Sequence, residues 1–134
     1  MLLSKDICEE TVWHKAAERV HVEVLKKLWD WAKEVQLTPE ELRNGMLLSR
    51  DYFRRTVWHF AAAVGHVELL KKLWDWAKEL QLTPEELRNE ILLSRDYFGH
   101  TVWHVAAENR DIDVLNIIED WAKELHLKQG ELLK

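Results

Sequence analysis

Residues 96–107 read Asp-Tyr-Phe-Gly-His-Thr-Val-Trp-His-Val-Ala-Ala, and the Thr-Val-Trp-His within this stretch occurs three times in the chain. The other two copies lie at 11–14 and 56–59, which gives a period of 45 residues. The same period places Trp-Ala-Lys-Glu at 31–34, 76–79 and 121–124. A fixed period of about 20–50 residues is typical of repeat proteins, in which each unit leaves an apolar face that its neighbour covers. The chain is therefore predicted to be a stack of three similar units.

Each unit is predicted to begin with a short helix followed by a longer one. Thr11, Thr56 and Thr101 occupy the N-cap position of the short helix, where a threonine oxygen accepts a backbone N–H of the first turn. In the first unit the longer helix has apolar residues at spacings of three and four, namely Val24, Leu25, Leu28, Trp29, Ala32 and Val35. Trp31 widens this apolar stripe, so we expect a helix that packs on two sides.

A third helix is predicted after each of the first two long helices. Thr38-Pro39-Glu40-Glu41 forms a capping box with proline at its preferred first helical position, and residues 83–86 repeat it. We expect these helices to cover roughly residues 39–49 and 84–94. Residues 50–55 then cross to the next unit as a turn or finger.

Residues 96–107 resemble the ankyrin signature Asp-x-x-Gly-x-Thr-Pro-Leu-His-x-Ala-Ala, and Gly65-His66 resembles the family's usual start of its second helix. Val-Trp replaces Pro-Leu, the turn glycine is kept only at Gly99, and the unit is about a dozen residues longer than the usual ~33. Armadillo and HEAT units have a similar length but lack the Thr-x-x-His-x-Ala-Ala run. The resemblance implies an all-α fold. It would be a right-handed α-solenoid with repeats 2–46, 47–91 and 92–134 in one domain, 1–134, the last repeat acting as a cap.

Comparison of the first two units separates scaffold from surface. They agree at 32 of 45 positions, and most of the differences fall at the finger and at the end of the short helix. The resemblance implies that these segments line a groove that binds protein partners, although exposed turns also vary freely. The candidate partner-binding residues are Tyr52, Phe53, Arg54, Arg55, Ala63, Val64, Tyr97, Phe98, His100, Glu108, Asn109 and Arg110. Aromatic residues and arginine favour a partner with an acidic patch and an apolar pocket. The extra third helix is the other possible binding face.

Two positions change in a way that is typical of capping units. Lys15 becomes Phe60 in the second unit, so we expect this position to face the preceding unit. Trp29 and Trp74 become Glu119 in the last unit, so we expect this position to face the following one. The near-identical units and apparent caps favour an array engineered from a consensus unit or trimmed from a longer one.

The histidines and carboxylates indicate structural roles. His14, His59 and His104 share one repeat position, and the resemblance implies that each ring hydrogen-bonds backbone across units. No spacing typical of a zinc site, a phosphate-binding loop or an acid–base pair occurs. We therefore expect no metal, no cofactor, no small-molecule substrate and no enzymatic activity.

The composition sets the remaining expectations. A net charge of −5 with mixed signs argues against nucleic-acid binding, and no apolar run is long enough for a membrane span. Cys8 is the only cysteine, which favours a reducing, cytoplasmic location. The sequence predicts a monomer that binds a protein partner. The alternative is a structural scaffold without a dedicated partner, possible because similar units can also associate end to end.

Overall fold

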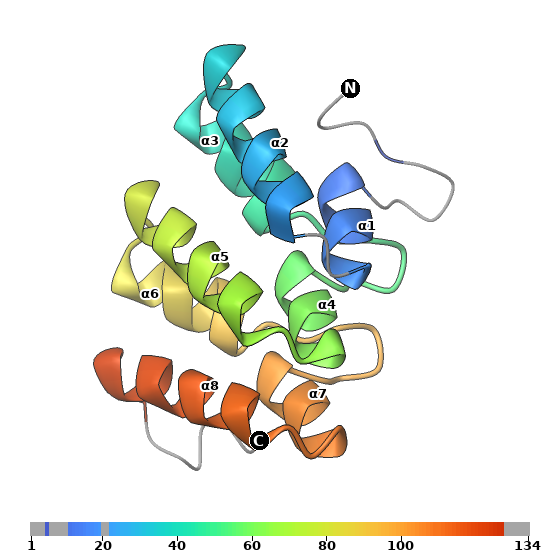
Figure 1. Ribbon diagram of the computed structural model, residues 1–134. Coiled ribbons are helices and arrows are strands. Elements are labelled where there is room, and N and C mark those ends of the chain that lie inside the picture. The colour runs from blue at the N-terminus through green and yellow to red at the C-terminus, as the bar shows by residue number, and fades with distance from the viewer. Residues whose placement is uncertain (1–4, 6–10, 20–21, 128–134) are drawn as a thin grey trace.

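The computed structural model describes residues 5, 11–19 and 22–127, and all regular secondary structure in them is helical (Figure 1). The first unit contains α1 (Val12–Glu18), α2 (Val22–Glu34), α3 (Pro39–Leu42) and the π-helix η1 (Arg43–Leu47). The second contains α4 (Val57–Val64), α5 (Val67–Glu79), α6 (Pro84–Glu86) and the π-helix η2 (Leu87–Leu92). The third contains α7 (Val102–Glu108) and α8 (Ile112–Glu124). Cys8, the first finger and the first turn at Val20-His21 lie outside the described residues.

The helices form layers that run through all three units. The short helices α1, α4 and α7 lie side by side, with α4 packed against both others, and the long helices α2, α5 and α8 form a second row (Figure 1). The third-helix segments lie beside the long helices, on the side away from the viewer. The all-α fold that the sequence predicted is confirmed for the described residues.

The predicted threonine N-caps of the short helices are confirmed. At each of them the backbone N–H of the threonine donates to histidine Nδ1 three residues later, at 3.0 Å in the first unit and 3.1 Å in the other two. In the first and third units the histidine N–H donates back to the threonine hydroxyl. Histidine takes the place that glutamate or glutamine has in a usual capping box.

The third helices start as predicted but end early. At Thr38 the hydroxyl accepts the Glu41 N–H at 3.1 Å and the Thr38 N–H donates to Glu41 Oε1 at 3.0 Å, and the box at Thr83 has the same geometry. The predicted ends at 49 and 94 are wrong, because helical structure stops at Leu47 and Leu92. After about one turn each of these helices continues as a π-helix. In the first unit the Leu48 N–H donates to the Arg43 carbonyl at the end of the π-helix.

Stacked tryptophans join the long helices of successive units. The Trp29 ring stacks on Trp76 with centroids 4.6 Å apart, and Trp74 stacks on Trp121 at 4.4 Å. The Trp58 indole packs edge-on against Trp74 and Trp121 and donates its N–H to the Leu47 carbonyl at 2.9 Å. The prediction that Trp29 and Trp74 face the following unit is confirmed.

Phe60 also lies as predicted, because its ring meets His14 of the preceding unit edge-on at 5.7 Å. Lys15, the equivalent residue of the first unit, is exposed.

The prediction that the first long helix packs on two sides is wrong. Val24, Val35 and Trp31 are each about half exposed, whereas Trp76 and Trp121 are 5% and 7% exposed. The preceding unit's tryptophan covers Trp76 and Trp121, but Trp31 belongs to the first of the three units. Only the inner side of α2, with Val22, Leu25, Trp29 and Ala32, is buried.

Candidate functional site

The two described fingers, residues 51–55 and 96–100, are built on a buried aspartate. Asp51 is 3% exposed, and its Oδ1 accepts the N–H groups of Phe53 (2.9 Å) and Arg55 (2.8 Å). The Asp51 N–H and carbonyl also bond across the finger to the Arg55 carbonyl and the Arg54 N–H. Asp96 repeats this arrangement in the second finger. Each finger is thus a closed turn held together by the hydrogen bonds of its aspartate.

Hydrogen bonds tie the fingers to each other. The Tyr97 N–H donates to the Phe53 carbonyl at 2.8 Å. The Arg50 guanidinium donates to the carbonyls of Arg54 and Arg95, both at 3.0 Å, and to the Ser94 hydroxyl. These contacts hold the two turns in a fixed relative position.

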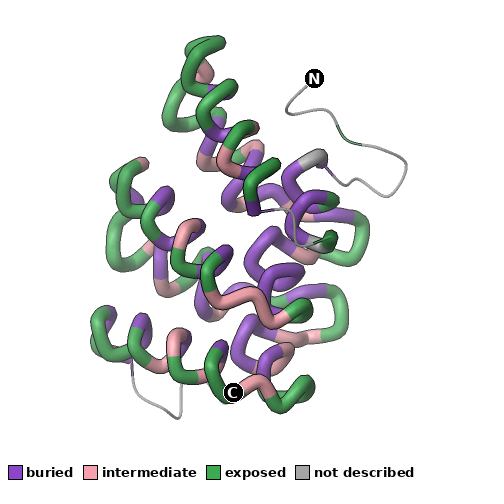
Figure 2. Tube along the Cα trace, in the orientation of Figure 1, coloured by how far each residue is buried: buried purple, intermediate pink, exposed green. Residues whose placement is uncertain are grey.

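Four aromatic side chains project from the fingers, and we call them the aromatic ladder: Tyr52, Phe53, Tyr97 and Phe98. Their exposed fractions are 67%, 37%, 66% and 64% in that order. Phe53 and Phe98 stack across the two fingers at 6.0 Å and 20°, and each tyrosine meets its neighbouring phenylalanine edge-on. Figure 2 shows both fingers as exposed loops beside the buried short helices. A group of large apolar rings exposed together on a protein surface is typical of an interaction site.

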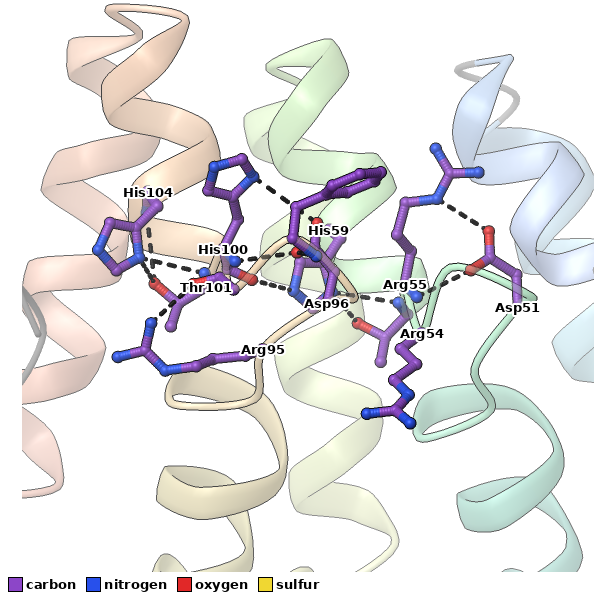
Figure 3. A network of polar contacts seen from close by, with 12 residues as sticks. Asp51, Arg54, Arg55, His59, Arg95, Asp96, His100, Thr101 and His104 are labelled. Atoms are coloured by element: carbon purple, nitrogen blue, oxygen red, sulfur yellow. Dashed lines mark hydrogen bonds and ion pairs between the residues drawn. The ribbon is translucent and has the colours of Figure 1, made fainter.

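Arg55 is engaged within the protein. Its Nε lies 2.9 Å from Asp51 Oδ2 (Figure 3). Its guanidinium lies over the rings of Phe53 (5.1 Å) and Phe60 (4.6 Å). The side chain is about one third exposed. Arg55 therefore supports the finger and offers a partner less charge than the sequence suggested. Arg54 is exposed and has a left-handed backbone, with φ 61°.

The remaining candidate residues form a second group at the other end of the short helices. Ala63 and Val64 are the last two residues of α4. In the third unit Glu108 is the last residue of α7, and Asn109 and Arg110 follow it. All five residues are exposed. The Asn109 side-chain amide donates to the Ala63 carbonyl at 2.9 Å, which connects the two turns. The eight residues of α4 separate this group from the fingers by about 12 Å along the helix. The structure thus places the twelve candidates in two groups.

Two of the repeated histidines join the units through backbone, as predicted. His14 Nε2 lies 2.9 Å from the Ser49 carbonyl in the next unit. His59 Nε2 lies 3.1 Å from the His100 carbonyl in the next unit (Figure 3). Among the described residues, the His104 ring hydrogen-bonds only Thr101 of its own unit. Since Nδ1 accepts the threonine N–H, Nε2 carries the proton and donates. Burial lowers the pKa of both His14 and His59, which keeps the rings neutral. His100, in the second finger, lies with its Nδ1 3.8 Å from Asp96 Oδ2.

Sequence analysis missed the residues that shape the fingers, above all Arg50 and Asp51. Their signal was present, because Arg95 and Asp96 repeat them at a period of 45 within a run that is identical at 47–53 and 92–98. Among the described residues there is no group of three or more histidine, cysteine or acidic side chains that could hold a metal ion. None of the described helices is long and apolar enough to cross a membrane.

No protein-family model matches the chain, and no curated protein matches its sequence.

Proposed function

We propose that this chain is a right-handed α-solenoid of three long ankyrin-like repeats that acts as a non-catalytic protein-binding module. The proposed binding face consists of the two fingers and the ends of the short helices. The observation that carries the proposal is the aromatic ladder, in which four exposed rings are held against one another on two fingers joined by hydrogen bonds.

The chemistry of this face defines the partner that would fit it. Tyrosine and phenylalanine supply large contact areas, and rings already held in place lose little side-chain freedom on binding. Arg54 adds an exposed positive charge beside the ladder, whereas Arg55 already pairs with Asp51. The face suits an apolar protein segment with a carboxylate near Arg54. A broadly acidic partner fits it less well.

The test is retention of a protein by the tagged chain from a cell lysate, identified by mass spectrometry. The test variant is Tyr52→Ala/Tyr97→Ala/Phe98→Ala, which removes the three most exposed rings and leaves Arg55 and Asp51 intact. The matched control is Val24→Ala/Val35→Ala, which removes exposed apolar side chains from α2 and from the residue that follows it. A protein retained by the parent and the control but lost by the test variant supports the proposal.

Equal retention by the parent and both folded variants contradicts the proposed face. Empty eluates from all three favour the scaffold function, in which the stack itself is the purpose of the chain. Circular dichroism of each variant ensures that a lost interaction reflects the face and not the fold.

A further inference from the structure

The two interfaces between long helices follow one rule. In the first, Trp29 stacks on Trp76 with 7° between the rings, and Lys33 pairs with Glu79 at 2.7 Å. In the second, Trp74 stacks on Trp121 with 6° between the rings, and Lys78 pairs with Glu124 at 2.7 Å. Each of the first two units thus presents a donor set, a tryptophan and a lysine four residues later. It meets an acceptor set in the next unit, a tryptophan and a glutamate three residues later.

The lysine of the donor set contacts the tryptophan of its own set and the glutamate of the acceptor set. Lys33 Nζ lies 5.7 Å from the Trp29 ring centroid, and Lys78 lies equally far from Trp74, so each ammonium group borders the stacked rings while it pairs with the glutamate. Ring stacking and charge pairing therefore select the same relative position of the helices.

The first unit carries an acceptor set that no described residue covers. Trp31 and Glu34 have the same spacing as Trp76 and Glu79, and both are exposed on α2. Trp31 is 52% exposed, against 5% for Trp76 in the same position of the next unit. Within the described part of the chain, Glu34 makes no ion pair.

We propose that this outer face of α2, centred on Trp31 and Glu34, binds a second chain that presents a donor set of the same repeat. The bound helix carries a tryptophan that stacks on Trp31 and a lysine that pairs with Glu34. This binding surface lies on α2 and is separate from the fingers, so the inference does not depend on the proposed function.

The chemistry of α8 argues against a second copy of this chain as the partner. Glu119 stands at the donor tryptophan position and Asn116 at the position of Lys26, while Lys123 is kept. A carboxylate placed over the negative face of the Trp31 ring is repelled by it, and it cannot replace the stacked indole. The last unit of this chain therefore does not bind the outer face of α2 in a second copy.

The test converts this end of the chain into a donor. The variant Trp31→Ala/Glu119→Trp has a donor tryptophan in its last unit and lacks the acceptor tryptophan of its first unit. The parent has the acceptor tryptophan of the first unit and lacks the donor tryptophan of the last. We expect each protein alone to sediment as a monomer and the mixture to form a complex of one chain of each. Replacing the parent by its Trp31→Ala variant should weaken the complex at least about tenfold, as loss of a central interface tryptophan does. Replacing it by Glu34→Lys should also weaken it, with the effect largest at low salt.

Absence of a complex between parent and donor overturns the proposal. Association of the parent with itself through Trp31 also overturns it, because the partner would then be a second copy of this chain. A second donor is Trp31→Ala/Asn116→Lys/Glu119→Trp. It also restores the lysine at the position of Lys26, which lies 3.9 Å from Glu68 of the next unit, and it should bind more tightly than the first donor. Circular dichroism and thermal unfolding select donors that are folded; if Glu119→Trp prevents folding, Glu119→Phe supplies the ring.

Discussion

At the scale of single residues, the units are joined by polar groups buried in the core. Two of the repeated histidines each link the threonine of their own unit to the following unit. His14 and His59 use Nδ1 for the N-cap and Nε2 for a carbonyl of the next unit. Both nitrogens are occupied, so the ring functions only as a neutral donor and acceptor, and its protonation would break the bond to the threonine N–H.

Acidification should therefore destabilise the protein through these rings. Burial holds the pKa of His59 below 6.5, so the unfolded chain takes up a proton first as the pH falls. The stabilisation is complete above about pH 6.5 and declines below it, by at most about 1.4 kcal/mol per pH unit for each histidine. Urea unfolding between pH 7.5 and 5 measures this slope. His59→Gln should be less stable than the parent at pH 7.5 but lose less stability as the pH falls, because it lacks the buried ring. Equal slopes for His59→Gln and the parent would contradict the prediction.

The finger backbone offers a second test at this scale. Arg54 has φ 61° where the next finger has Gly99 with φ 81°, and non-glycine residues are strained in this region. Arg54→Gly should therefore raise the free energy of unfolding by about 0.5–1 kcal/mol. Gly99→Ala should lower it by a similar amount through backbone strain alone, since no atom lies within 4 Å of the added Cβ. Chemical denaturation of both variants decides the matter, and a less stable Arg54→Gly protein would refute the strain argument.

At the scale of elements, the long helices depend on their neighbours to different degrees. Trp74 lies between Trp58 and Trp121 and is 5% exposed, while Trp31 is largely exposed on α2. The same residue type on the same kind of helix thus contributes to the core in one unit and to the surface in another.

Alanine substitution should measure this contrast. Trp74→Ala leaves a cavity between two units and should cost about 3–5 kcal/mol. Trp31→Ala should change the stability of the isolated chain by no more than about 0.5 kcal/mol, because the ring has few neighbours. Thermal or urea unfolding of the two variants gives the comparison. Similar losses of stability in both variants would mean that the stacked tryptophan pair contributes little to the free energy of unfolding.

The elements also show which features a sequence can predict. The helix starts at Thr38 and Thr83 were predicted because a capping box lies within four residues. The π-helical ends of the third helices were not, since local periodicity does not separate spacings of four and five. The exposure of Trp31 and the pairing of Arg55 with Asp51 were missed for a different reason. Both depend on which side chains lie next to the residue in the folded structure, and the residue type alone does not show this.

At the scale of the whole molecule, the middle unit is the one covered on both sides. Helix α4 packs between α1 and α7, and all of its residues except Ala63 and Val64 are buried. Ion pairs such as Lys33–Glu79 and Lys78–Glu124 repeat along the exposed side of the long helices. Exposed pairs of this kind contribute little individually, so burial between units dominates the stability.

Hydrogen–deuterium exchange should follow this order. Amides of α4 and α5 should exchange most slowly, because opening them breaks contacts with two neighbours, and those of α2 and α8 should exchange faster. Mass spectrometry of peptides from each helix measures the rates. In Trp74→Ala, exchange in α8 should accelerate more than exchange in α2, since the lost ring faces α8. Slower exchange in α8 than in α5 of the parent would show that the stack is stabilised from its end.

The paired indoles have a further, optical consequence. Rings that lie 4.6 and 4.4 Å apart and almost parallel couple their electronic transitions, so each pair contributes its own circular-dichroism band in the near ultraviolet. Trp29→Phe removes one band and Trp74→Phe the other, which assigns each signal to one junction between units. The chain therefore carries an intrinsic spectroscopic label at both junctions. The order in which they separate can be followed without any added dye.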